Sequence, residues 1–460
     1  MIIRCIIRDF CINMSKYIIA LACLSITIAS CKKRNENPAK SAGNNILSFT
    51  INNSQVGEAV LNADSATIRI FVKQGTDLTT IKPEIRVADK ASISPASGQQ
   101  VNLLPDSVIT YTVTAESGAT QKWQVQVKIY PKPNLASYKP DVKPDSVFQG
   151  YFTRYNGWNS GDGAQSILLP DGRTVWMFGD SFVGEVNPDR TRVNNKTWFI
   201  NNVMMIQQGS EFTTHHGGTS DKPTALFVPD NPKRFYWARH GFVDGNELYL
   251  TLMELEKVKV NGRDELAHHA DKMAVLSLPD MRYIKMLDIP YRNGISYGDR
   301  CFSDGNYNYM FGQKGNGWNN YLYIARAAAG KAKDTWEFFA GDKGWVKDMS
   351  SATTIKMATH ISSAPTLINR NGRYYMIIHR NFFSNDILMF RADKPEGPYT
   401  DEVKLYTTTD ADNSYLAIGH PQFMEGNRLL IGYSVAGDIF KSYKNVDICV
   451  PKFIRVTLPE

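Results

Sequence analysis

One hairpin-like phrase recurs five times between residue 150 and the C-terminus. Each copy is an apolar strand end, an acidic residue or Asn close before a Gly, and a returning strand of apolar and aromatic residues. The turn glycines are Gly172, Gly245, Gly305, Gly372 and Gly426, which are 73, 60, 67 and 54 residues apart. This spacing is typical of propeller blades, because hairpin sheets cannot bury both faces alone and stack radially instead.

The five copies therefore predict an all-β fold with a five-bladed β-propeller. A large β-sandwich with coincidental turns is the alternative, since Asp-Gly turns occur in every antiparallel protein. The stretches between the copies lack a sustained apolar period of 3.6 residues, which argues against an α/β barrel.

An apolar segment near the N-terminus has the features of an export signal. Lys16 precedes an apolar run from Tyr17 to Ile28 that is short for a membrane span, and small residues lead to Cys31. The segment resembles a bacterial lipoprotein signal, which implies lipid modification of Cys31. We expect residues 1–31 to be this signal, with Met14 as the true start, and an outer-membrane anchor at the periplasmic face or cell surface. An uncleaved membrane anchor is the alternative.

A second all-β unit precedes the propeller. Residues 32–43 are small and polar and predict a flexible tether, and residues 44–130 contain short alternating strands rich in Thr, Ser, Val and Ile. We predict an immunoglobulin-like sandwich over 44–130, a proline-marked linker over 131–145 and the propeller over 146–460. The sandwich resembles the modules that follow the lipid anchor in polysaccharide-utilisation lipoproteins of the Bacteroidetes.

Charge and cysteine content narrow the range of partners. The formal charge of +7 falls to +5 without the first 30 residues, and this net charge is too small to indicate nucleic-acid binding.

Cys301 and Cys449 remain in the mature body, and both are expected to be buried, unpaired thiols. We expect a monomer.

Two carboxylates are placed symmetrically about the first turn. Asp162 lies nine residues before Asp171, and Asp180 lies nine residues after it. Both therefore finish at the same end of one hairpin, at one mouth of the channel. A two-residue loop would make them diagonal, and a three-residue loop or a bulge would make them directly opposite.

Equivalent positions in the other blades also carry polar residues. A ring of such groups suits a hydroxyl-rich ligand, which is held by many directional hydrogen bonds. Tryptophans 158, 237 and 318 are candidate platforms for sugar rings. The candidate substrate-binding residues are Trp158, Arg239, His240, Asp299, Gln313, Trp318, His360, Arg380 and His420.

The first blade carries a family resemblance. Its motifs are Asn159-Ser-Gly-Asp-Gly163, Leu169 to Phe182 and Asn201-Asn-Val-Met204. They resemble the five-bladed propeller proteins that include the endo-D-arabinanases of domain-of-unknown-function family 4185, and more distantly glycoside hydrolase family 43 and the sialidase-like propellers. The resemblance implies an inverting glycosidase with an acidic pair that maps onto Asp162 and Asp180.

The predicted function is hydrolysis of a polysaccharide or oligosaccharide, with an arabinan-type substrate suggested by the resemblance. Asp162 is the candidate base, Asp180 the candidate acid and Glu254 a reserve acid, and the two aspartates could exchange roles. We expect no cofactor, and a structural calcium near His420 has no signature of its own. The alternative is a surface lipoprotein that binds glycan without cleaving it.

Overall fold

The computed structural model describes residues 40–459 apart from 52–54, 57, 74–75, 106, 131–134, 316–319, 358–360, 363, 371, 382–383, 410–412 and 439. The predicted signal and its Cys31 lie outside the described residues. None of the helices in the described part has the length and apolarity to span a bilayer.

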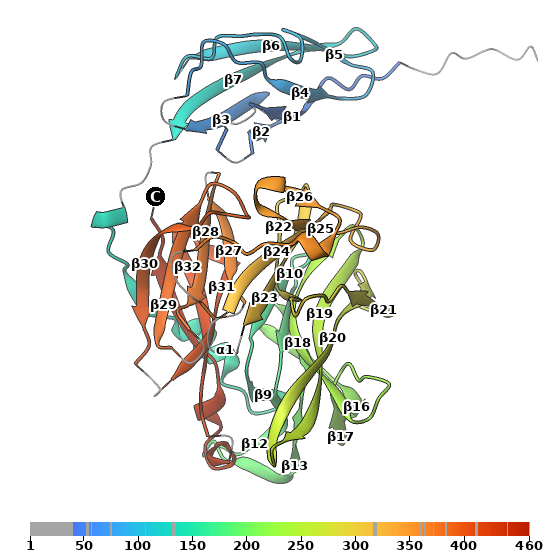
Figure 1. Ribbon diagram of the computed structural model, residues 1–460, viewed down its shortest axis with the longest axis vertical. Helices are drawn as coiled ribbons and strands as arrows, with labels where there is room; N and C mark the ends of the chain where they lie inside the picture. Colours follow the sequence, from blue (N-terminus) through green and yellow to red (C-terminus); the bar gives the residue numbers. More distant parts are fainter. Residues whose placement is uncertain are drawn as a thin grey trace, which may run out of the picture.

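The first unit is a small two-sheet sandwich (Figure 1). One sheet pairs β1 (Ile46–Thr50) with β4 (Glu84–Val87). The other has the order β2-β3-β7-β6-β5, formed by β2 (Val60–Asn62), β3 (Thr67–Lys73), β7 (Thr120–Tyr130), β6 (Val108–Thr114) and β5 (Ser92–Ser94). Alternate residues of these strands point inward, and Trp123 and Tyr111 are fully buried between the sheets. This confirms the predicted sandwich.

The second unit contains five sheets arranged as propeller blades. In each sheet, the two innermost strands are the hairpin that recurs in the sequence. The blades in chain order are β10 (Gln165–Leu168), β11 (Thr174–Phe178), β14 (Val203–Gln208) and β15 (Glu211–His215); β18 (Arg234–Asp244), β19 (Glu247–Val260), β20 (Arg263–Ser277) and β21 (Tyr283–Ile289); β22 (Ser296–Ser303), β23 (Tyr307–Gly315), β24 (Asn320–Ala328), β25 (Glu337–Phe339) and β26 (Trp345–Val346); β27 (Thr366–Arg370), β28 (Arg373–His379), β29 (Asp386–Ala392) and β30 (Thr400–Thr407); and β31 (Ser414–Glu425), β32 (Arg428–Val435), β33 (Lys452–Thr457) and β8 (Val142–Pro144).

The ring is closed by a strand from the start of the domain. β8 is the outermost strand of the fifth blade, where Pro144 pairs with Ile454. Directly after it, Asp145 caps α1 (Ser146–Phe152) by accepting from the amide of Phe148, and its other oxygen accepts from Arg455 at 2.7 Å. The two ends of the domain are thus joined by backbone pairing and a buried ion pair.

The remaining elements are short. A three-stranded sheet outside the blades has the order β13-β12-β9, with β9 (Trp158–Gly161), β12 (Ser181–Val186) and β13 (Arg192–Ile200). A hairpin joins β16 (Gly217–Thr219) to β17 (Lys222–Thr224). The 3-10 helices are η1 (Leu135–Ser137), η2 (Gly341–Lys343), η3 (Met349–Ser351), η4 (Lys441–Tyr443) and η5 (Val446–Cys449).

The channel has two distinct ends. The five turn glycines, with φ between +60 and +89°, lie at one end, which we call the turn face. The inner strands lose regular pairing near the other end, where residues with positive φ occur within or just before four of them: Ala164, Gly298, Ala364 and Leu416. Asp162 and Asp180 lie at this second end, which we call the carboxylate mouth. The five-bladed propeller predicted from the sequence is therefore confirmed.

Candidate functional site

Asp162 and Asp180 lie directly opposite each other. The amide of Leu169 donates to the carbonyl of Arg173, which leaves a three-residue loop over 170–172. Gly161 pairs with Ser181, and the Asp162 amide donates to the Asp180 carbonyl at 3.2 Å. The alternative that the sequence left open is thus settled in favour of the opposed arrangement.

Glycines surround this pair because side chains would collide there. A Cβ at Gly179 would lie 2.6 Å from Oδ1 of Asp162, and one at Gly161 would lie 2.7 Å from the Asp180 carbonyl oxygen. Gly163 has a φ of +95°, which favours glycine. The amide of Gly179 also donates to the Asp162 carbonyl, so two residues face Asp162 in a bulge, a feature that re-aims side chains beside active sites.

The two carboxylates are held by different neighbouring blades. Tyr415 of β31 donates its hydroxyl to Asp162 Oδ2 at 3.1 Å. Oδ1 of Asp180 accepts from Trp237 Nε1 of β18 at 2.7 Å and from Asn201 Nδ2 at 2.8 Å. The fifth and second blades flank the first on opposite sides, so each carboxyl group has a hydrogen-bond donor from a different neighbour of the first blade.

The surroundings raise both pKa values, and the effect is larger for Asp162. Burial, followed by the charge of Asp180, raises the pKa of Asp162 from 3.8 to about 7, and the hydrogen bond from Tyr415 opposes this rise. Burial also raises the pKa of Asp180, but its hydrogen bonds from Asn201 and Trp237 favour the ionised form. Near neutral pH, Asp162 can therefore hold a proton beside an ionised Asp180.

A buried ionic cluster lies behind the mouth in the second and third blades. Arg239 contacts Asp271 at 3.1 Å and Asp299 at 3.1 Å, and His268 contacts Asp271 at 2.9 Å. Burial raises the pKa of Asp299 to about 6, against the opposing charge of Arg239. Arg239 and Asp299 are only 6% and 4% exposed. Both side chains are thus buried and in contact with each other, and their expected role in binding substrate stays a prediction.

The middle of the channel is filled by side chains. Arg300 donates to Gln165 and to the carbonyl of Gly419, so it bridges the first and fifth blades from the third. His240 bonds to the Ser166 carbonyl and to the Cys301 amide, and His420 Nδ1 contacts Ser166 Oγ at 2.6 Å. Burial lowers the pKa of both histidines well below the usual value.

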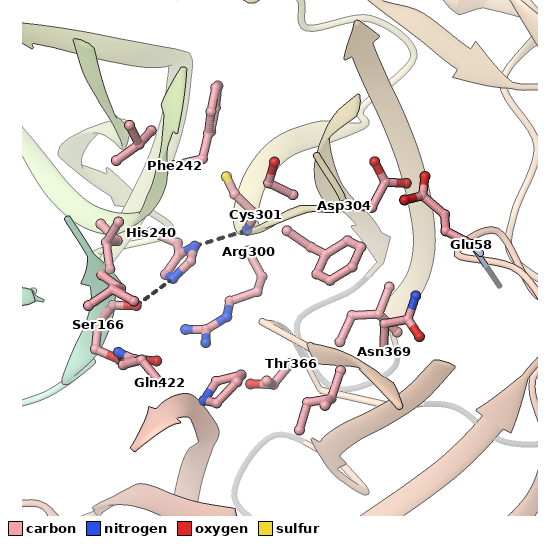
Figure 2. Close-up of a pocket in the computed structure, with 18 of the residues that line it drawn as sticks. Glu58, Ser166, His240, Phe242, Arg300, Cys301, Asp304, Thr366, Asn369 and Gln422 are labelled. Carbon is pink, nitrogen blue, oxygen red and sulfur yellow. Dashed lines mark hydrogen bonds between the residues drawn. The ribbon is translucent and has the colours of Figure 1, made fainter. Parts of the chain in front are cut away.

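A cavity of about 850 Å³ lies beyond this plug at the turn face (Figure 2). Its walls include Phe242 and Thr366, and Glu58 of the sandwich borders it near Asp304. His240 lines this cavity and His420 is 0% exposed. Both histidines thus belong to the filled middle of the channel, and their expected contact with substrate stays a prediction.

Two other predicted residues have partners elsewhere. Trp158 is 0% exposed and packs on Phe178 with ring centroids 4.3 Å apart, so its ring is part of the core, and its expected role as a sugar platform stays a prediction. Arg380 is paired with Glu402 at 2.6 Å and Asp386 at 3.5 Å on the outer strands of its blade. Its partners are thus on the outer strands, and its expected role in binding substrate stays a prediction.

Glu254, the reserve acid, is 6% exposed and forms an ion pair with Arg234 at 3.0 Å. Gln313 is partly exposed, and its Oε1 has no hydrogen-bond partner among the described residues. Trp318 and His360 lie outside the described residues.

The described part contains no group of three His, Cys, Asp or Glu side chains that could hold a metal. Cys301 is buried, Cys449 is half-buried, and both are free thiols.

Sequence reasoning missed Tyr415 and Asn201 as partners of the carboxylates. Tyr415 lies eleven residues before Gly426, nearly as Asp162 lies ten before Gly172. Alignment of the repeats could therefore have found it. Asn201 belongs to the loop between β13 and β14 and has no repeated counterpart that would have revealed its role.

The fold and the site define a five-bladed β-propeller protein with a paired-carboxylate mouth. The chain belongs to the family described as Domain of unknown function (DUF5005), whose model matches residues 145–458. The family whose model matches differs from family 4185, which the first-blade motifs suggested. Residues 46–127 match the model described as SGBP, N-terminal. No curated protein matches the chain.

One solved structure shares the fold, and others are similar to a lesser degree. A protein from Bacteroides ovatus described as a proposed hydrolase is 23% identical, with a TM-score of 0.60, and the alignment covers 71% of this chain and 93% of that one. A GH43_1 enzyme from Xanthomonas citri has 12% identity and a TM-score of 0.38, with 68% and 93% covered. An exo-beta-1,3-galactanase from Phanerochaete chrysosporium has 13% identity and a TM-score of 0.39, with 64% and 60% covered. The last two likenesses are too weak to support an inference about function.

Proposed function

We propose that the protein is a glycoside hydrolase whose catalytic groups are Asp162 and Asp180. The observation that carries this proposal is the opposed pair of half-buried carboxylates, one of which has a pKa of about 7. Glycosidases need one carboxyl that is protonated at working pH and a second that is ionised. The environments of this pair differ in that direction.

The roles that we propose reverse the first assignment from sequence. Asp162 is the general acid and protonates the glycosidic oxygen as the bond to the anomeric carbon breaks. Asp180 is the general base and takes a proton from the water that attacks that carbon. Asp162 then regains a proton from solvent and Asp180 releases one, which restores the site.

We further propose that the reaction inverts the anomeric centre. Opposed residues on paired strands have Cβ atoms about 5 Å apart, and donors from the blades on the two sides of the first, Tyr415 and Trp237, favour carboxyl groups that diverge from each other. Divergence favours the wider separation of roughly 6.5 to 9.5 Å that leaves room for a water molecule. Proton NMR of the first-formed sugar anomer tests this directly, and a retained configuration would reject inversion.

The test of activity is release of reducing ends from a panel of glycans. Arabinan and arabinogalactan come first, because the first-blade motifs suggest an arabinan-type substrate. Asp162→Asn and Asp180→Asn should each reduce turnover at least about a hundredfold without loss of fold. Asp171→Asn is the matched control, since this exposed turn carboxylate pairs with Arg173 far from the mouth. Near wild-type turnover in either mouth variant would remove that residue from the mechanism.

The second candidate function is capture of a glycan without cleavage. The match of residues 46–127 to the SGBP N-terminal model favours it. In that case no glycan in the panel would release reducing ends, yet a glycan cast into a native gel would retard the protein. Both functions would suit a polysaccharide-utilisation lipoprotein of the outer membrane.

Anchoring through a lipid on Cys31 is part of this proposal. Cys31→Ser should abolish fatty-acid labelling and release the protein from membranes, because the thiol is the only attachment point for the diacylglyceryl group. Continued labelling of the variant would place the acylation site elsewhere.

A further inference from the structure

Two exposed aromatic side chains share one buried aromatic neighbour close to the carboxylate mouth. Phe199 is 41% exposed and Tyr443 is 47% exposed, although most aromatic residues of the described chain are buried. Both pack edge-on against the buried Phe182, with ring centroids 5.1 and 5.4 Å away. We call these three residues the aromatic shelf. Phe440, just before η4, is 82% exposed and adjoins it in sequence.

The shelf lies on the same face of the sheet as the two catalytic candidates. In the β13-β12-β9 sheet, Phe182 pairs with Phe199 on one side and with Ser160 on the other. Side chains alternate along a strand, so the residues two positions from Phe182 and Ser160 project from that face. These residues are Asp180 and Asp162. Two residues of extended strand span about 7 Å, the scale of one sugar ring with its linkage.

The opposite face of the sheet is core, which fixes the orientation of the shelf. Ser181 and Val183 alternate with Phe182, and they face inward: Ser181 Oγ accepts from the buried Trp158 Nε1 at 3.2 Å, and Val183 packs in the same core cluster. Because Asp162 and Asp180 lie on the same face of the sheet as Phe182 and Phe199, a strand register that turned the aromatic side chains toward the core would also turn the two aspartates toward it. The outward direction of the shelf is thus built into the strand register.

A buried arginine makes the shelf rigid. The guanidinium of Arg192 lies 3.7 Å from the centre of the Phe182 ring and donates to Ser160 Oγ at 2.6 Å and to Asn159. Arg192 is 4% exposed, so its hydrogen bonds are shielded from water. A preorganised platform loses little conformational entropy when a ligand binds.

From this arrangement we infer that Phe199 and Tyr443 form a sugar-binding subsite continuous with the Asp162–Asp180 pair. The ligand class is a neutral glycan, because the apolar C–H face of a sugar ring suits an exposed aromatic face and the adjoining carboxylates disfavour anions. The inference rests on the proposed function. It extends that function by naming the residues that hold the chain next to the bond to be cleaved.

The test compares Phe199→Ala and Tyr443→Ala with matched surface variants. For the glycan that is cleaved fastest, each change should raise KM about three- to tenfold and leave kcat within about twofold. Tyr443→Phe keeps the ring and should restore the wild-type KM. Tyr283→Ala is the control, because Tyr283 is 57% exposed but lies on β21, the outermost strand of the second blade. Thermal melts of each variant establish that the fold is kept.

Binding in an inactive background separates this inference from the proposed function. Asp162→Asn protein is run in native gels cast with arabinan or arabinogalactan, alone and combined with Phe199→Ala or Tyr443→Ala. Loss of retardation in the shelf variants supports the subsite even if the wild-type protein releases no reducing ends. Cleavage by the wild-type protein with unchanged KM and retardation in both shelf variants overturns the subsite while leaving the hydrolase proposal intact. Unchanged retardation without cleavage overturns the subsite as well.

Discussion

Asp162→Asn should change how the stability of the propeller depends on pH, and this can be measured without knowing the substrate. The pKa of Asp162 is raised to about 7 in the folded protein, against an ordinary value of 3.8. The folded state therefore favours the protonated carboxyl. Its contribution to stability is fully present below about pH 4 and is lost as the pH rises through about 7. Asn keeps the shape of the neutral acid but does not titrate.

The magnitude follows from the difference between the two pKa values. Each tenfold change in proton affinity is worth about 1.4 kcal/mol, so a rise from 3.8 to about 7 sets an upper bound of about 4 kcal/mol. Asp162 is only half-buried at an open mouth, and water relieves part of this cost. We expect about 2 kcal/mol. Relative to wild type, Asp162→Asn should gain that amount of unfolding free energy as the pH rises from about 4 to about 7, with no further change above that.

The assay is urea unfolding followed by tryptophan fluorescence. Seven of the eight tryptophans lie after residue 145, so the signal reports the propeller. Asp171→Asn is the control: hydrogen bonds from Arg173 lower the pKa of Asp171, so it is ionised throughout this range. A difference between Asp162→Asn and wild type that does not change with pH would refute the raised pKa and, with it, the assignment of Asp162 as the acid.

Three further changes test other parts of the site. Trp237→Phe removes the indole N–H that stabilises ionised Asp180, so the acidic limb of kcat/KM should move up by about one pH unit; an unmoved limb would exclude Asp180 as the base. Gly179→Ala places a Cβ 2.6 Å from Oδ1 of Asp162 and should cost about a hundredfold in turnover with an unchanged circular dichroism spectrum. Trp158→Ala should lower the unfolding free energy by about 3–5 kcal/mol, because it empties a packed core site; a raised KM at unchanged stability would support Trp158 as a sugar platform.

The architecture could be predicted because it depends on local chemistry that repeats. Glycine at a tight turn and alternating apolar residues in the flanking strands are readable in each copy, and five copies leave radial stacking as the economical solution. The pairing of Asp162 with Asp180 follows from the same symmetry, since equal distances from one turn bring both residues to one end of a hairpin.

The chemistry of the neighbouring blades could not be predicted in this way. Tyr415 reaches Asp162 across about 250 residues of sequence, and Trp237 and Asn201 reach Asp180 from other elements. The same positions in the repeat also gave candidates whose partners the repeat does not reveal. Arg239 and Asp299 contact each other in the interior, whereas Arg380 contacts acidic partners on the outer strands of its blade.

By itself, therefore, the sequence determined the number of blades, the turn positions and the end of the channel at which the aspartates lie. Only the tertiary structure decided which of the polar residues near that end face solvent, and which aspartate holds its proton more tightly. The physical reason is that strand pairing is specified by neighbours along the chain. Exposure and pKa depend instead on the burial, charges and hydrogen-bond donors that distant segments bring to the same point.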